Sequence, residues 1–186
     1  MDLLLRASYS LLLLLSMLTH FRESILAPQR QRSYLLIILF FVVLDQITKG
    51  LVLHSITLYE TIEIIPGFFN LTYLYNTGAA FGMFHDSNRF FIAVSLLALF
   101  VLLWQQRHFA APLMRWGWIL IISGIIGNLT DRFFHGHVID FLDFQFSYYH
   151  WPAFNIADSC ICVATGFFLL ASFLPESNSD LSKKRN

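Results

Sequence analysis

The sequence predicts a membrane protein that is mainly α-helical: a four-transmembrane-helix bundle with a small β-sheet. Hydrophobic residues make up 56% of the 186 residues and charged residues 13%, which is far from the balance of a soluble domain. Apolar stretches long enough to cross a bilayer recur along the chain. The net charge is zero and basic residues form no run before the last few positions, so nucleic acid is not an expected partner.

Four apolar stretches are near the length of ~17–25 residues that a membrane-spanning helix needs. They are Tyr34–Leu53, Phe90–Gln105, Leu113–Leu129 and Asn155–Leu174. Pro112 precedes the third stretch and Pro175 follows the fourth, positions at which proline costs a helix little or ends it. We therefore expect the membrane domain at residues 34–175 and a polar tail at 176–186.

Residues 1–33 form an N-terminal extension. Its apolar stretch, Leu3–Phe21, is interrupted by charged and hydroxyl side chains, so we expect an interfacial helix or an extra helix there. A cleaved signal peptide fits less well, because Ile25-Leu26-Ala27 lacks the small residues at which such peptides are cut.

The basic residues predict that both termini face the cytoplasm. Nine of the 12 Lys and Arg residues fall on one side of the predicted spans, and only Lys49, Arg89 and Arg132 fall on the other; basic loops remain cytoplasmic. Eight of the 12 acids lie on or near the outer side, so we expect the chemistry there. These acids are Asp45, Glu60, Glu63, Asp86, Asp131, Asp140, Asp143 and Asp158.

A small sheet is predicted between the first two spans. Residues 60–64 and 70–76 alternate polar with apolar side chains, a period of two that is typical of strands. Gly67, Gly78 and Gly82 supply turns. We expect this sheet to lie on the membrane surface.

Ionisable side chains inside a span are functional candidates, because each costs ~2.5–3.5 kcal/mol on insertion scales. In the first span, Asp45 and Lys49 are one turn apart. The pair either anchors the helix end or has a role beside a site. At the outer end of the third span, Asn128 and Asp131 share a helical face. Arg132 follows them and can form an ion pair with Asp131, or hold another carboxylate or a lipid phosphate.

Two further acids frame the fourth span. Asp140 lies among apolar residues in the segment 138–144, which we expect to be a loop in which a carboxyl group is desolvated. Asn155 is a good helix N-cap, and Asp158 takes the third helical position, where the helix dipole favours a carboxylate. Asp158 is therefore either a capping acid or a partner that Asp140 reaches from its loop.

A pair of carboxylates predicts a specific kind of chemistry. Two carboxylates in a low-dielectric pocket share a proton, so that one acts as base and the other as acid. In an aspartyl protease the first activates a water and the second hydrogen-bonds the scissile carbonyl. Ser123 and Ser159 have no evident base nearby in the sequence, so a serine nucleophile is less favoured.

Two alternative functions are compatible with parts of the sequence. A metal hydrolase would use the residues that crowd one segment, His135, His137, Asp140, Asp143 and His150, which suit zinc. A proton-coupled carrier would use intramembrane carboxylates as a relay. The acids cluster at one boundary and no internal repeat is visible, which disfavours the carrier.

Five ordered blocks resemble the signature blocks of the signal peptidase II (lipoprotein signal peptidase) family. They are Asp45-Gln46-Ile47-Thr48-Lys49, Asn76-Thr77-Gly78-Ala79-Ala80-Phe81-Gly82, Gly127-Asn128-Leu129-Thr130-Asp131-Arg132, Val138-Ile139-Asp140-Phe141 and Phe154-Asn155-Ile156-Ala157-Asp158-Ser159. The resemblance covers about residues 34–175 and leaves the extension outside. The segment Gly82–Asp86 departs from the more apolar run that is common in the family.

The resemblance implies a monomeric four-span aspartyl endopeptidase of the bacterial inner membrane, with a periplasmic sheet and active site. Its substrate would be a prolipoprotein that carries a diacylglyceryl group on the cysteine after the cut, and neither cofactor nor metal is expected. The implied catalytic pair is Asp140 and Asp158, with Asp131 as the competing third acid. The residues implied to bind substrate or support the site are Asp45, Lys49, Asn76, Gly78, Asn128, Asp131, Arg132, Asn155 and Ala157.

Overall fold

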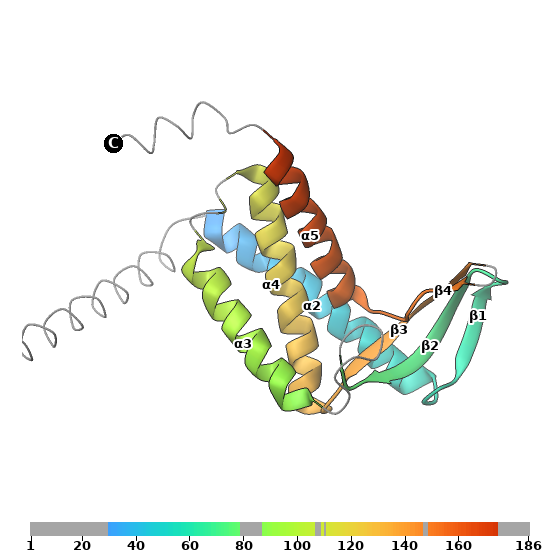
Figure 1. Ribbon diagram of the computed structural model, residues 1–186. Helices are drawn as coiled ribbons and strands as arrows, with labels where there is room; N and C mark the ends of the chain where they lie inside the picture. The colour runs from blue at the N-terminus through green and yellow to red at the C-terminus, as the bar shows by residue number, and fades with distance from the viewer. Residues whose placement is uncertain (1–29, 79–86, 107–108, 110, 147–148, 175–186) are drawn as a thin grey trace, which may run out of the picture. The chain divides into compact units, whose positions relative to one another are not determined.

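The computed structural model describes residues 30–78, 87–106, 109, 111–146 and 149–174. The chain divides into two compact units, Met1–Ile37 and Ile38–Asn186, and the account below concerns the second. The predicted N-terminal extension up to residue 29, the C-terminal tail and the turn at Gly82 lie outside the described residues. Figure 1 shows the elements in chain order.

Four helices occupy the four stretches predicted to span the membrane. They are α2 (Arg30–Ser55), α3 (Asn88–Trp104), α4 (Pro112–Phe134) and α5 (Ile156–Phe173). Within the described part of the chain, three are long and apolar enough to cross a membrane, namely α2 from Arg32, α4 and α5, whereas α3 is a shorter apolar helix of 17 residues. Large apolar side chains are exposed along α2, α3 and α5, as expected of surfaces that face lipid.

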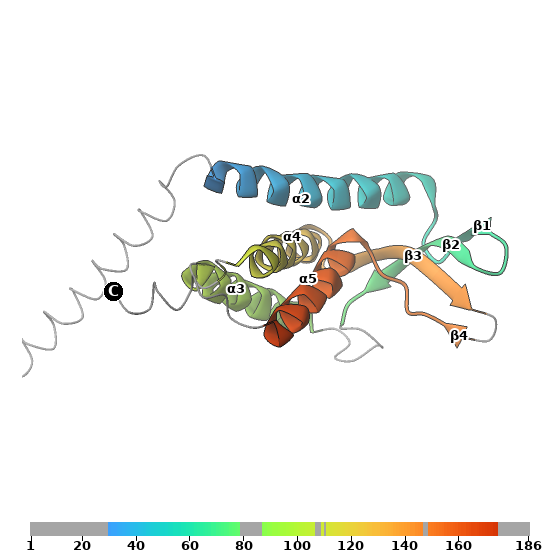
Figure 2. The same cartoon turned by 90° about the horizontal axis from the view of Figure 1, so that it is seen from above.

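Helix α4 extends to Phe134, five residues beyond the predicted end, and therefore carries Asp131 and Arg132 on regular helix. It packs against α3 and α5 (Figure 2). Glycines allow the close approach to α5: a Cβ added at Gly124 would lie 2.4 Å from the Ala157 carbonyl oxygen. This approach brings the C-terminal part of α4 to the first turn of α5.

A four-stranded antiparallel sheet has the order β1-β2-β3-β4. Its strands are β1 (Thr61–Ile65), β2 (Phe69–Asn76), β3 (Val138–Phe146) and β4 (Tyr149–His150). The two predicted strands are confirmed as β1 and β2. The prediction of a loop around Asp140 was wrong, because Asp140 lies in β3, paired with Leu74 of β2. Residues 138–144 are rich in the branched and aromatic residues that favour strands.

Apolar packing fixes the sheet to the end of α2. Val52 of α2 and Ile56, which directly follows the helix end, form one buried cluster with Tyr73 of β2 and with Ile139 and Phe141 of β3. On the other side, Phe154 exchanges backbone hydrogen bonds of 2.8 and 3.0 Å with Leu142. Because Phe154 directly precedes Asn155, this pairing holds β3 beside the start of α5.

Candidate active site

Asp140 and Asp158 come together at the junction of β3 and α5, and Asn155 connects them. The Asn155 side-chain Nδ2 donates to Asp140 Oδ1 at 2.7 Å, and its backbone N–H donates to Asp158 Oδ2 at 3.3 Å. Asn155 is fully buried and Asp140 is 3% exposed. The geometry therefore places two carboxyl groups from different elements on one buried amide residue.

The start of α5 has the predicted cap. Asn155 Oδ1 accepts from the Asp158 backbone N–H at 2.8 Å, which completes a reciprocal capping box with the bond from Asn155 N–H to Asp158. Asp158 is thus a capping acid and at the same time a neighbour of Asp140. The two interpretations of Asp158 hold together.

Asn76 holds the second oxygen of Asp140. Its Nδ2 donates to Asp140 Oδ2 at 2.8 Å, while its Oδ1 accepts from Gly78 N–H at 3.1 Å. Arg132 Nη2 donates to the Gly78 carbonyl oxygen at 2.9 Å. Gly78, which lies just after β2, is thereby held at both its N–H and its carbonyl oxygen, and the Asn76 amide points at the candidate acid.

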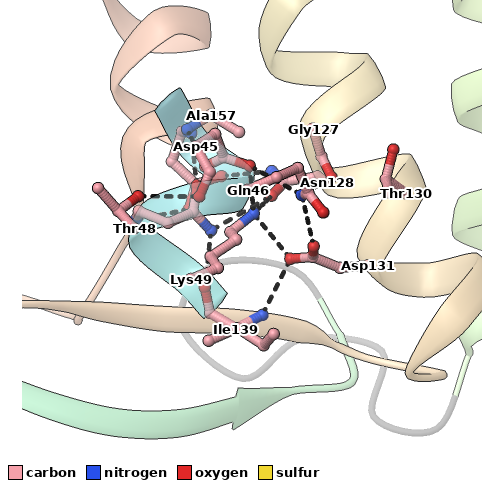
Figure 3. A network of polar contacts seen from close by, with 12 residues as sticks. Asp45, Gln46, Thr48, Lys49, Gly127, Asn128, Thr130, Asp131, Ile139 and Ala157 are labelled. Atoms are coloured by element: carbon pink, nitrogen blue, oxygen red, sulfur yellow. Dashed lines mark hydrogen bonds and ion pairs between the residues drawn. The ribbon is translucent and has the colours of Figure 1, made fainter. Parts of the chain in front are cut away.

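Lys49 lies at the centre of a buried network of polar residues (Figure 3). Its Nζ donates to Asp45 Oδ2 at 2.8 Å, to Asp131 Oδ2 at 2.7 Å and to Asn128 Oδ1 at 3.1 Å. Asn128 Nδ2 then donates to Asp158 Oδ1 at 2.7 Å. Lys49 is 1% exposed, and its buried positive charge is compensated by the carboxylates of Asp45 and Asp131. The Asn128 amide connects this charge to Asp158.

Both carboxylate oxygens of Asp131 accept bonds within this network. Besides Lys49, it accepts from Gln46 Nε2 at 2.8 Å and from the Ile139 backbone N–H at 3.2 Å. Of the partners considered for Arg132, Asp131 forms no ion pair with it among the described residues, because consecutive helix residues point in different directions. Asp131 pairs with Lys49, and the Arg132 guanidinium lies 4.8 Å from the ring centroid of Phe91.

Asp45 supports the site from α2. Its Oδ1 accepts from the Ala157 backbone N–H at 2.9 Å, one of the unpaired N–H groups of the first turn of α5. A Cβ added at Gly127 would lie 2.7 Å from Asp45 Oδ2, so Gly127 leaves the space for this carboxylate. The Asp45–Lys49 pair therefore does more than anchor the end of α2.

The surroundings of Asp140 bias it toward the protonated form. Burial, followed by the charge of Asp158, raises the pKa of Asp140 to about 7, against the opposing effects of the bonds from Asn76 and Asn155 and the charge of Lys49. A carboxyl group with this pKa can donate or accept a proton near neutral pH. The site can thus provide one carboxylate and one carboxylic acid side by side.

The two acids that a metal hydrolase would use do not face the same side of the sheet. Asp140 and Asp143 are three apart on β3 and so face opposite sides. Asp143 accepts from Thr72 at 2.8 Å and pairs with His150 at 3.2 Å. Among the described residues, no three His, Cys, Asp or Glu side chains form a group that could hold a metal ion.

The supporting residues named from the sequence all lie in or beside this site, together with several residues that the sequence did not single out. Gln46 bonds both Asp45 and Asp131, and a polar amide inside an apolar span was a signal that could have revealed it. Gly127 and the Ile139 backbone N–H carry no signal in a single sequence, because their roles depend on close approach and on strand geometry.

Comparison with known proteins gives a consistent family. The family model for signal peptidase (SPase) II matches residues 37–174. The lipoprotein signal peptidase of Syntrophotalea carbinolica is 44% identical over 147 residues, which cover 76% of this chain and 91% of that protein. The lipoprotein signal peptidase of Shewanella piezotolerans is 40% identical over 158 residues, with 82% and 91% covered.

Two solved structures, each described as a bacterial membrane enzyme, share the fold. The first aligns with a TM-score of 0.71 and 32% identity, covering 75% of this chain and 86% of that chain. The second aligns with a TM-score of 0.70 and 31% identity, covering 77% and 94%.

Proposed function

The chain belongs to the signal peptidase II family, and on that premise we propose that it removes the signal peptide from diacylglyceryl-modified prolipoproteins, cutting just before the lipidated cysteine. It is an integral membrane aspartic endopeptidase, with Asp140 and Asp158 as the catalytic pair. The observation that supports this pair most strongly is the shared contact with Asn155, which donates to both carboxyl groups.

The alternative pair with Asp131 has less support. Both oxygens of Asp131 already accept bonds from Lys49, Gln46 and the Ile139 N–H, which leaves this carboxyl group less available to a substrate. Asp140 instead has a pKa raised to about 7 and an amide at each oxygen. A group that must exchange a proton near neutral pH corresponds to Asp140.

The reaction follows from the pair. One carboxylate removes a proton from a water, and the resulting hydroxide attacks the scissile carbonyl carbon. The protonated partner donates to the carbonyl oxygen as negative charge develops there. The tetrahedral intermediate then expels the amine, which takes a proton from the pair. The two aspartates, one water and the peptide account for every bond made and broken.

The neighbouring residues position the substrate. Arg132 is 8% exposed, and its Nη1 is buried without a hydrogen-bond partner among the described residues. We assign this donor to a substrate backbone carbonyl or to the oxygens of the lipid head group. Asn76, Gly78, Asn128, Asn155 and Ala157 line the same site, while Asp45 and Lys49 support it from α2.

The placement in the membrane follows from the charges. With α3 as the fourth span, both termini lie in the cytoplasm, and the sheet and site lie at the periplasmic face of the inner membrane. Membrane lipids surround the exposed apolar side chains of the helices, and the enzyme acts as a monomer.

The substrate class is tested with two precursor peptides that differ only in the diacylglyceryl group. Each buried methylene contributes about 0.8 kcal/mol to membrane association, and anchoring also orients the scissile bond at the membrane boundary. Purified enzyme in detergent is expected to cut the lipidated peptide well and the unmodified peptide hardly at all. Comparable rates on the two peptides would contradict the assignment.

A further inference from the structure

Three asparagines surround the catalytic pair, and each has its side-chain oxygen fixed by a separate donor. Asn76 Oδ1 accepts from Gly78 N–H at 3.1 Å, and Asn155 Oδ1 accepts from Asp158 N–H at 2.8 Å. An amide whose oxygen accepts a bond must turn its NH₂ group the other way. In each case the NH₂ group therefore points at a carboxylate of the pair.

The third amide differs from the other two. Asn128 Oδ1 accepts from the Lys49 ammonium at 3.1 Å and from Asn155 Nδ2 at 3.2 Å, and the Asn128 Nδ2 donates to Asp158 Oδ1 at 2.7 Å. A backbone N–H is neutral, whereas Lys49 brings a positive charge to the far side of the Asn128 amide. A charge-assisted bond polarises the amide and strengthens the bond that it donates.

The charges around the pair are consequently unequal. Asp158 lies on the charged relay and in the first turn of α5, where the helix dipole favours an anion. Asp140 lies on a strand, which has no such dipole, and its amides are fixed by backbone donors. The charged groups that face this region are Asp45 and Lys49 from α2, Asp131 and Arg132 from α4, Asp140 from β3 and Asp158 from α5.

We propose that Lys49 is a positioning residue which, through the Asn128 amide, holds Asp158 as the ionised member of the resting pair and leaves the shared proton on Asp140. Asp158 is then the base that activates water, and Asp140 is the acid that faces the scissile carbonyl oxygen. This inference rests on the proposed function of the pair. All three donors of the ammonium are engaged, so the orientation of the relay is fixed.

The burial of Lys49 supports this role. A buried ion pair often contributes little net stability compared with an apolar replacement, so packing alone does not account for a lysine that is 1% exposed. The pKa of Asp140, raised to about 7 by burial and by the charge of Asp158, agrees with a proton on Asp140 beside an ionised Asp158.

The pH dependence of kcat/KM tests the proposal in two opposite directions. The acid limb of this profile reports loss of the ionised base of the free enzyme, as a property of the coupled pair. Lys49→Met removes the cation, so the acid limb is expected to move to higher pH by about one unit. At neutral pH, kcat should fall more than tenfold while KM changes less than about threefold, because the relay contacts the pair and not the substrate.

Asp131→Asn should move the acid limb the other way. This substitution retains the side-chain shape but leaves the ammonium with one carboxylate instead of two, so the positive charge felt at the pair increases. The expected result is an acid limb at lower pH. Gln46→Leu is the matched control, because it removes bonds to Asp45 and Asp131 without changing a charge, and its acid limb should remain at the wild-type position.

Each outcome decides the proposal. A folded Lys49→Met enzyme with a wild-type pH profile would overturn it, even if the catalytic pair is correct. If Lys49→Met fails to fold, as judged by thermal unfolding in detergent, Asp131→Asn decides alone: a shift to lower pH supports the relay, and no shift or the reverse overturns it. Full activity of Asp140→Asn would instead mean that the proposed catalytic pair itself is wrong. This result is distinct from a failure of the Lys49 proposal alone, in which Asp140→Asn is inactive and Lys49→Met keeps the wild-type pH profile.

Discussion

Asn155 shows how one residue can serve both structure and chemistry. Its side-chain oxygen caps α5, while its Nδ2 holds Asp140 and its backbone N–H holds Asp158. The requirements of the helix end and of the site are met by the same geometry. A capping role for Asp158 and the proposed catalytic role are therefore compatible, although the sequence presents them as alternatives.

The raised pKa of Asp140 predicts a pH dependence of stability. A carboxyl group with a folded-state pKa near 7 binds a proton that the unfolded chain, with a pKa near 4, has already released. Stability therefore falls as pH rises from about 4 to about 7 and levels off above that. Asp140→Asn removes the titrating group, so its unfolding temperature in detergent should fall less than that of the wild type between pH 5 and pH 7.5.

The control for this prediction is the same pair of unfolding temperatures for Gly166→Ala. This substitution changes no titrating group and adds a Cβ that would meet nothing within 4 Å, so the difference between pH 5 and pH 7.5 should keep the wild-type size. A wild-type slope in Asp140→Asn would contradict a protonated Asp140.

The elements that build the site are held together by close contacts. Asp45 of α2 bonds Ala157 N–H of α5, and Asp131 of α4 bonds Ile139 N–H of β3. Each carboxylate thus joins two elements through a backbone N–H group. The glycines of α4 make these approaches possible, because a side chain there would separate the helices.

Gly124→Ala should destabilise the protein. The added Cβ would meet the Ala157 carbonyl oxygen at 2.4 Å and Ile161 at 2.6 Å, so α4 and α5 must move apart, at a cost of about 1–3 kcal/mol. Gly166→Ala in α5 is the matched control, because its Cβ would meet nothing within 4 Å, and helix propensity favours alanine by about 0.8–1.0 kcal/mol. Thermal unfolding should rank the wild type between the two variants; equal stability of the two alanine variants would contradict the packing.

At the scale of the whole molecule, hydrophobic length predicted the four helices, and alternation predicted β1 and β2. β3 was missed because its partner β2 lies about seventy residues earlier, so no hairpin turn in the sequence indicates that the two strands pair. The acids of the site were recognised from their cost inside apolar segments. Ion pairs between different helices were not, since contacts such as Lys49–Asp131 join residues that are 82 positions apart and depend on the packing of α2 and α4.

The N-terminal extension should be dispensable for cleavage. The family match begins at residue 37, and no residue assigned to the site precedes Asp45. A chain that begins at Gln31 is expected to cut lipidated precursor at close to the full-length rate per folded molecule. A large loss of kcat in a truncated protein that is still folded would mean that the extension contributes to the working enzyme.

The measurement that tests the catalytic pair most directly is single-turnover cleavage of a lipidated precursor by Asp140→Asn and Asp158→Asn, with Asp143→Asn as control. Each of the first two substitutions keeps the shape of the side chain but removes one member of the proton-sharing pair. Both are expected to bind precursor while cleaving at less than a few percent of the wild-type rate, and Asp143→Asn is expected to cleave at a rate close to wild type. Substantial cleavage by either of the first two variants, expressed and folded at the normal level, would contradict the pair.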